Sequence, residues 1–188
     1  MKSALKMPNS EIAETFESWN RSRELKSFLI EITAQIFLKK DDLTHIDLID
    51  AIKDEAKQKG TGKWTTQSAL DLGVAVSTMT AAVDARLMSS LKPLRLRAEK
   101  DIGALDIKTV RLTTHALKDA LFLSKICSYA QGYALIAEAS RIHSWNIDLA
   151  EVCRIWKGGC IIRSTLLKTF EEAFRKDASI PNLLLSPE

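Results

Sequence analysis

The stretch that most constrains the fold runs over residues 113–143, where apolar side chains occupy most of the circumference of a helix. A helix that is apolar on most of its surface is usually buried on several sides. At ~1.5 Å per residue, a helix of this length would span about 45 Å. We therefore expect it to be a long, buried central helix around which the rest of the chain packs.

Apolar residues recur at helical spacing through nearly all of the remaining chain, and no segment has the alternation of a convincing strand. Gly158-Gly159 is expected to end a helix, since glycine adopts the left-handed cap conformation at little cost. The connection at Lys100–Asp106 is expected to be less ordered. The sequence predicts an all-α fold in one domain, residues 1–188. Its other helices are expected near residues 10–19, 25–36, 48–56, 65–73, 77–91, 148–157 and 161–175, before an apolar tail at 180–185.

Composition excludes several classes of protein. The hydrophobic share of 46% argues against disorder, and the formal net charge of +3 is too small and too dispersed to indicate a nucleic-acid or membrane partner. No apolar run approaches the ~20 residues that a membrane span needs, and the N-terminus does not resemble a signal peptide. The three cysteines, in no Cys-x-x-Cys pattern, indicate reduced thiols and a cytoplasmic protein. The three histidines show no spacing typical of a metal site.

A loop rich in glycine and lysine, QKGTGKWT at residues 58–65, offers a candidate anion site. Gly60 and Gly62 let backbone N–H groups approach a ligand, while Lys59 supplies charge and Thr61 a hydroxyl. The loop matches neither a P-loop nor a dinucleotide fingerprint, because their further residues are missing. A plain turn between helices with solvated lysines remains the alternative. Trp64 is expected to anchor the loop in the core.

Arg86 stands out on the helix expected over residues 77–91. On a helical wheel it lies between Met79 and Val83, near the middle of the apolar stripe. A guanidinium placed there needs an anion or a set of carbonyl groups as partners. An internal ion pair, or extension of the side chain to the surface, would meet that need. The second possibility is that Arg86 belongs to an anion site, because its planar fork matches phosphate and carboxylate oxygens.

Several strings in order along the chain resemble one enzyme family. IKDEAKQKGTGKWT, SALDLGV and AVDAR resemble the signature region of the decarboxylating 6-phosphogluconate dehydrogenases, and EIAETFESWN, ALFLSKICSYAQGYALIAEAS, IWKGGCIIRS and PNLLL are similar to further helices of their C-terminal domain. The resemblance runs over nearly all of the chain. It implies an all-α domain, in agreement with the periodicity.

The resemblance also implies a function and a site. In the family, Lys59, Thr61 and Arg86 correspond to residues that hold the phosphate of 6-phosphogluconate during its NADP-dependent oxidation and decarboxylation. The catalytic residues and the NADP-binding domain of family members are expected upstream of Met1, so this chain alone is expected to be inactive. Family members are homodimers through the helical domain, which implies a second copy as partner.

Some positions depart from the family pattern. Lys57 replaces a small residue, Ala75 and Ser77 stand where prolines are common, and Asp84 stands where an aromatic residue is common. These departures leave a second hypothesis open, in which the chain is a non-catalytic helical scaffold or partner-binding protein with the same fold. A nucleic-acid-binding helical domain is supported only by the small positive charge.

Overall fold

The computed structural model describes residues 1–103 and 112–187. Within these ranges the protein is helical, and it has no β-strand beyond two isolated bridges, Ser27 with Ser164 and Lys40 with Asp47. The expected all-α class is thus confirmed. The helices are α1 (Lys2–Leu5), α2 (Asn9–Arg21), α3 (Phe28–Leu38), α4 (Leu48–Ala51), α5 (Thr61–Asp71), α6 (Ser77–Ser90), α7 (Lys92–Ile102), α8 (Thr114–His143), α9 (Leu149–Trp156), α10 (Leu166–Lys176) and the 3₁₀ turn η1 (Leu183–Leu185).

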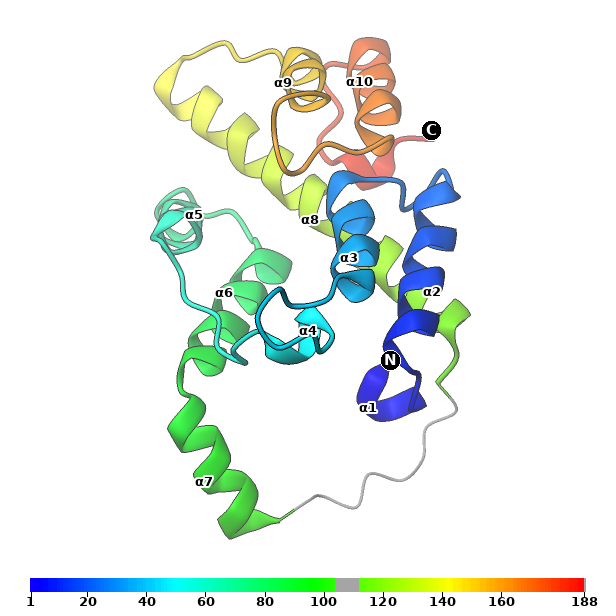
Figure 1. Cartoon of the computed structure of the whole chain (residues 1–188). Coiled ribbons are helices and arrows are strands. Elements are labelled where there is room, and N and C mark those ends of the chain that lie inside the picture. The colour runs from blue at the N-terminus through cyan, green and yellow to red at the C-terminus, as the bar shows by residue number, and fades with distance from the viewer. Residues whose placement is uncertain (104–111, 188) are drawn as a thin grey trace.

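The 30-residue helix α8 is the central element and runs diagonally above α4, α6 and α7 (Figure 1), but of its described residues only Ala130 and Tyr133 are buried, fewer than its apolar circumference predicts. Its N-cap is Thr113, whose hydroxyl accepts a hydrogen bond from the N–H of Ala116. The antiparallel pair α2 and α3 lies over its N-terminal half, and α9 and α10 pack together beside its C-terminal half. Helices α5, α6 and α7 form a separate arm, joined to the rest where α6 meets α8.

Two groups of buried side chains hold the helices together. The larger joins α8, α9, α10 and η1 around Tyr133, Cys153 and Leu167, which are all at most 1% exposed. The smaller joins α2 and α3 to α8 around Trp19, Leu25 and Ile30. By contrast, α6 and α7 contain no buried residue at all. The arm is therefore held by far less apolar burial than the two helix pairs.

The periodicity places most helices correctly, and its largest errors lie at three helix ends. Helix α4 ends at Ala51 instead of continuing to Ala56, α5 begins at Thr61 instead of Thr65 or Thr66, and α10 begins at Leu166 instead of Ile161. The beginning of α10 involves a contact distant in the sequence, because the N–H of Thr165 donates to the carbonyl of Lys26.

The expected connection at Lys100–Asp106 is wrong in its first part, because Lys100 to Ile102 belong to α7; residues 104–106 lie outside the described ranges. Pro93 lies in the first turn of this helix, which begins at Lys92. It occupies one of the first helical positions, whose N–H groups have no partner within a helix. The turn at Gly158-Gly159 follows α9 as expected, with Gly159 at a φ of +72°.

Candidate functional site

The three predicted phosphate ligands lie at the junction of α5 and α6. Lys59 precedes α5, Thr61 is the first residue of α5, and Arg86 lies on α6. The Arg86 guanidinium donates a hydrogen bond to the backbone carbonyl of Lys57 at 2.5 Å, two residues before Lys59. The structure therefore brings Arg86 to the same segment of chain as the glycine loop.

The two glycines of the loop have different roles. Gly60 is the N-cap of α5 and has a φ of +106°, a conformation that favours glycine, and its carbonyl accepts the N–H of Trp64 at 2.9 Å. Gly62 lies against α6, where a Cβ atom would stand 2.8 Å from Cγ2 of Val83. Gly60 thus turns the chain into the helix, and Gly62 lets the first turn of α5 approach α6 closely.

The segment before the loop is held by side chains of α6 and α7. The N–H of Ala56 donates to Oγ of Ser89 at 2.9 Å, and Arg95 donates to the carbonyl of Asp54 at 2.8 Å and to the Asp54 carboxylate at 3.1 Å. Together with Arg86, these side chains satisfy backbone groups that a continued α4 would have paired internally. Sequence reasoning missed Ser89 and Arg95, since neither has a spacing that marks it.

Arg86 follows one of the possibilities that the sequence left open, extension of its side chain to the surface. Arg86 is exposed, and so are apolar side chains of α6 such as Leu87 and Met88, at 47% and 59%. The hydrogen-bond partner of the Arg86 guanidinium is a backbone carbonyl group. The sequence predicted that this guanidinium would need either an anion or carbonyl groups as partners. Trp64 is not the expected core anchor, because 71% of its surface is exposed. Among the described helices, the one extensive contact of α5 is with α6. This contact leaves Trp64 uncovered.

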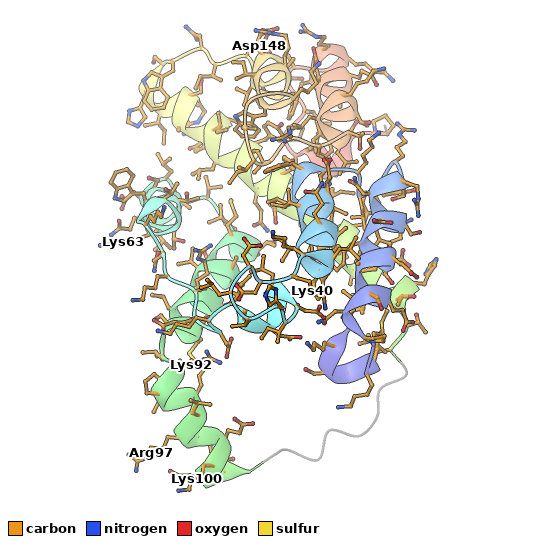
Figure 2. All side chains as sticks on the ribbon, viewed as in Figure 1. Lys40, Lys63, Lys92, Arg97, Lys100 and Asp148 are labelled. Carbon is orange, nitrogen blue, oxygen red and sulfur yellow. The ribbon has the colours of Figure 1, made fainter. Side chains whose placement is uncertain are left out.

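The junction has the chemistry of an anion site. Lys59, Thr61 and Arg86 are all exposed to solvent, and the 11-residue helix α5 directs its first N–H groups and the positive end of its dipole toward the loop. Lys63 belongs to the same sequence motif but projects from α5 away from α6 (Figure 2). Lys57 is occupied by Glu55, with 3.5 Å between their charged atoms. Neither Lys59 nor Arg86 has an ion-pair partner among the described residues, which leaves these two cations as the candidates for one shared anion.

The other reactive groups of the described residues suit structural roles. Cys153 is fully buried, its thiol donates to the Tyr133 hydroxyl at 3.0 Å, and burial raises its pKa to about 11. Within the described ranges no group of three or more His, Cys, Asp or Glu is placed to hold a metal ion. In the same part of the chain, no helix combines the length and the apolar character that crossing a membrane requires.

Comparison with known proteins gives one consistent match. The family model described as 6-phosphogluconate dehydrogenase, C-terminal domain, matches residues 1–188. The chain is 49% identical over 192 residues to the decarboxylating 6-phosphogluconate dehydrogenase of Synechocystis sp., covering 100% of this chain and 40% of that relative. It is 45% identical over 189 residues to the NADP(+)-dependent, decarboxylating enzyme of Bacillus subtilis, covering 98% and 40%.

A solved structure agrees with the sequence comparison. The 6-phosphogluconate dehydrogenase of Plasmodium falciparum, solved in its apo form and in complexes with NADP+ and with 6-phosphogluconate, matches with a TM-score of 0.89 and 39% identity. The match covers 100% of this chain and 41% of the Plasmodium chain. The chain thus spans about 40% of the length of the relatives it matches.

Proposed function

The chain belongs to the 6-phosphogluconate dehydrogenase C-terminal domain family, and we propose that residues 1–188 form the helical domain that supplies the substrate phosphate site of such an enzyme. In this proposal Lys59, Thr61 and Arg86 hold the phosphate of 6-phosphogluconate. The whole enzyme oxidises and decarboxylates 6-phosphogluconate to ribulose 5-phosphate in the pentose phosphate pathway. NADP as its cofactor is supported by the name of the Bacillus subtilis relative.

The observation that carries the proposal is the hydrogen bond from Arg86 to the carbonyl of Lys57. It brings a guanidinium from α6 to the chain segment that leads directly into Lys59 and Thr61, although 25 or more positions separate Arg86 from them in the sequence. A carbonyl oxygen is a weaker partner for a guanidinium than a phosphate dianion, because the dianion adds Coulomb attraction and can accept two parallel N–H bonds from the guanidinium. A phosphate at the junction therefore competes favourably with Lys57 for Arg86.

The three side chains divide the work of binding a phosphate. Arg86 offers parallel N–H donors to two oxygens, Lys59 places a mobile point charge on a third, and the Thr61 hydroxyl donates one neutral hydrogen bond. Hydrogen bonds to charged groups contribute about 1.5–3 kcal/mol, and exposure of all three side chains sets their contributions near the lower end. Since 1.4 kcal/mol corresponds to a factor of ten, losing either cation should weaken binding about tenfold.

Isothermal titration calorimetry of the 188-residue chain tests the proposal. The ligand is 6-phosphogluconate, and gluconate, which lacks the phosphate, is the comparison. Lys59→Met and Arg86→Met should each raise the Kd about tenfold, and Thr61→Val should raise it roughly threefold. Lys63→Met is the matched control, because it removes a charge from the same motif at a side chain that points away from α6 (Figure 2); its Kd should stay unchanged.

Two outcomes would contradict the proposal. Equal affinity for gluconate and 6-phosphogluconate would mean that the phosphate is not recognised. A folded protein that releases no heat with millimolar 6-phosphogluconate would favour the alternative, a helical scaffold that keeps the fold without the site. Circular dichroism of each variant separates loss of the ligand contact from loss of the fold.

The proposal extends to a homodimer in the cytoplasm. The dimer is supported by apolar side chains that α6 and α7 leave exposed, among them Met88 at 59% and Leu94 at 60%, since exposed apolar patches mark association surfaces. A cytoplasmic location is supported by Cys127, Cys153 and Cys160, which are all free thiols. Sedimentation equilibrium measures the first claim, and a mass that stays monomeric at all concentrations would refute it for this chain.

A further inference from the structure

Three contacts hold residues 54–57 along α6 and α7, and they follow a regular order. They pair Asp54 with Arg95, Ala56 with Ser89, and Lys57 with Arg86. As the segment advances along the chain, its partners step back from α7 into α6, so the segment runs antiparallel to these helices. Every contact joins a side chain of α6 or α7 to a backbone group of the segment. Together the three contacts fix the path by which the chain reaches Lys59.

Arg95 makes the most extensive of these contacts. Its Nη2 donates to the carbonyl of Asp54 at 2.8 Å and to the carbonyl of Ser89 at 3.1 Å. Ser89 lies in the last turn of α6, where carbonyl groups have no partner within the helix. The Asp54 carboxylate adds an ion pair at 3.1 Å, but its side chain is 70% exposed, and exposed ion pairs contribute little. The two carbonyl contacts thus make Arg95 a junction between the segment, α6 and α7.

Arg86 has two competing partners. It donates to the carbonyl of Lys57, and in the proposed function it also binds the substrate phosphate. Donors that turn toward the phosphate are lost to the carbonyl, so ligand binding weakens one of the three contacts that hold the segment. Arg95 and Ser89 keep their backbone partners, because neither is a proposed phosphate ligand. These two side chains therefore hold the segment while Arg86 changes partner.

The position of the segment matters for Lys59, which follows it by two residues. A lysine side chain is flexible, so the backbone at its base must be fixed before the ammonium reaches a defined point. Fixing a backbone during binding costs conformational entropy, and a segment already held in place avoids that cost. Arg95 thus lowers the cost of binding without touching the ligand, since its hydrogen bonds go to Asp54 and Ser89.

We propose that Arg95 is a positioning residue of the phosphate site, which holds residues 54–57 in place while Arg86 exchanges the Lys57 carbonyl for the substrate phosphate. This role rests on the proposed function, in which Arg86 and Lys59 bind the phosphate. Loss of Arg95 is therefore expected to weaken phosphate binding although every phosphate ligand remains.

Calorimetric titration with 6-phosphogluconate measures this effect. Arg95→Met should raise the Kd about tenfold, equivalent to about 1.4 kcal/mol, which is the order of the cost of fixing one residue's backbone. Ser89→Ala, a smaller change, should raise it about threefold, because the N–H of Ala56 loses its partner. Arg97→Met is the matched control and should leave the Kd unchanged. It removes a second arginine from α7 (Figure 2), one that pairs with Asp101 at 3.2 Å.

Two backgrounds separate positioning from a general loss of stability or charge. In Lys59→Met the lysine to be positioned is gone, so adding Arg95→Met should raise the Kd by less than about threefold. In Lys63→Met, whose side chain points away from α6 (Figure 2), the full effect of about tenfold should persist. Arg95→Lys keeps the charge but lacks the planar fork, so it should bind the ligand nearly as weakly as Arg95→Met.

Limited digestion with trypsin, in the absence of ligand, tests the same contacts independently. Trypsin cleaves after lysine, and cleavage after Lys57 and Lys59 requires this part of the chain to leave α6 and α7. Arg95→Met should speed cleavage at these two sites about tenfold relative to the native chain, while Arg97→Met should not. Mass spectrometry locates the cuts, and circular dichroism confirms that each variant is folded.

The results that overturn the role of Arg95 differ from those that overturn the phosphate site. A Kd unchanged by Arg95→Met and Ser89→Ala, with Arg86→Met still weakening binding, refutes the positioning role alone. An equal loss in the Lys59→Met and Lys63→Met backgrounds, full rescue by Arg95→Lys, or unchanged cleavage by trypsin refutes it as well. Equal affinity for gluconate and 6-phosphogluconate refutes the phosphate site itself, and with it the role of Arg95.

Discussion

Substitution of Gly62 by alanine tests the close contact between α5 and α6. A Cβ at residue 62 would stand 2.8 Å from Cγ2 of Val83. Carbon atoms that are not bonded prefer separations of about 3.5–4.0 Å, so the added methyl would be about 0.7 Å too close. Val83 is β-branched and lies within α6, where valine keeps one side-chain rotamer almost exclusively. One of the two helices must therefore move.

The size of the effect follows from two opposing terms. Overpacking costs about 1–3 kcal/mol, while replacing a helical glycine with alanine gains up to ~1 kcal/mol, and less in a first turn. Gly62→Ala should therefore lower the free energy of unfolding by roughly 1–2 kcal/mol. In the Val83→Ala background the obstructing methyl is gone, and the same substitution should be neutral or stabilising. The two substitutions should thus be coupled by about 1–3 kcal/mol.

A double-mutant cycle measures this coupling. Urea unfolding followed by far-UV circular dichroism gives the free energy of unfolding for the native chain, Gly62→Ala, Val83→Ala and the double variant. Titration of the same four proteins with 6-phosphogluconate measures whether the proposed phosphate site is intact. Moving the first turn of α5 away from α6 separates Thr61 from Arg86 and should weaken binding. If Gly62→Ala changes stability by the same amount in both backgrounds, the described packing of α5 on α6 is incorrect.

Two further predictions concern the larger group of buried side chains. Leu167→Ala should lower the free energy of unfolding by roughly 2–5 kcal/mol, because Leu167 is 0% exposed, whereas the exposed Leu184→Ala should change it by less than about 0.5 kcal/mol; equal effects in urea unfolding would contradict the assignment of the core. Cys153 should resist a thiol reagent at pH 8 until the chain is unfolded, because burial raises its pKa to about 11, and rapid native-state labelling of Cys153 located by mass spectrometry would contradict this.

The sequence predicts the helices whose ends are determined locally. Asp148 caps α9 by accepting the N–H of Ala150 at 2.8 Å, and Thr113 caps α8 in the same way, so a side chain next to the helix marks each boundary. The long helix α8 is equally evident, since its apolar pattern continues for 30 residues. For such elements the sequence signal and its structural cause lie within one turn of each other.

The candidate site was predicted less completely because its geometry depends on distant residues. Pairing of Arg86 with Lys57 crosses 29 positions, and pairing of Arg95 with Asp54 crosses 41. The helical periodicity of residues 48–56 carries no information about these distant side chains. It therefore predicted that the helix continues to residue 56, whereas α4 ends at Ala51. The roles of Lys59, Thr61 and Arg86 as phosphate ligands stay predictions until binding is measured.

The way residues 54–57 are held has a consequence for the dynamics of the protein. They are anchored by side chains of α6 and α7, the two helices of the arm that contain no buried residue. Amide hydrogen exchange in this segment should therefore follow the opening of the arm and proceed well before exchange in α10, whose Leu167 and Phe170 are buried. A ligand bound by both Lys59 and Arg86 would connect the loop before α5 to α6. Slower amide exchange across residues 54–90 would therefore indicate that a ligand occupies the phosphate site.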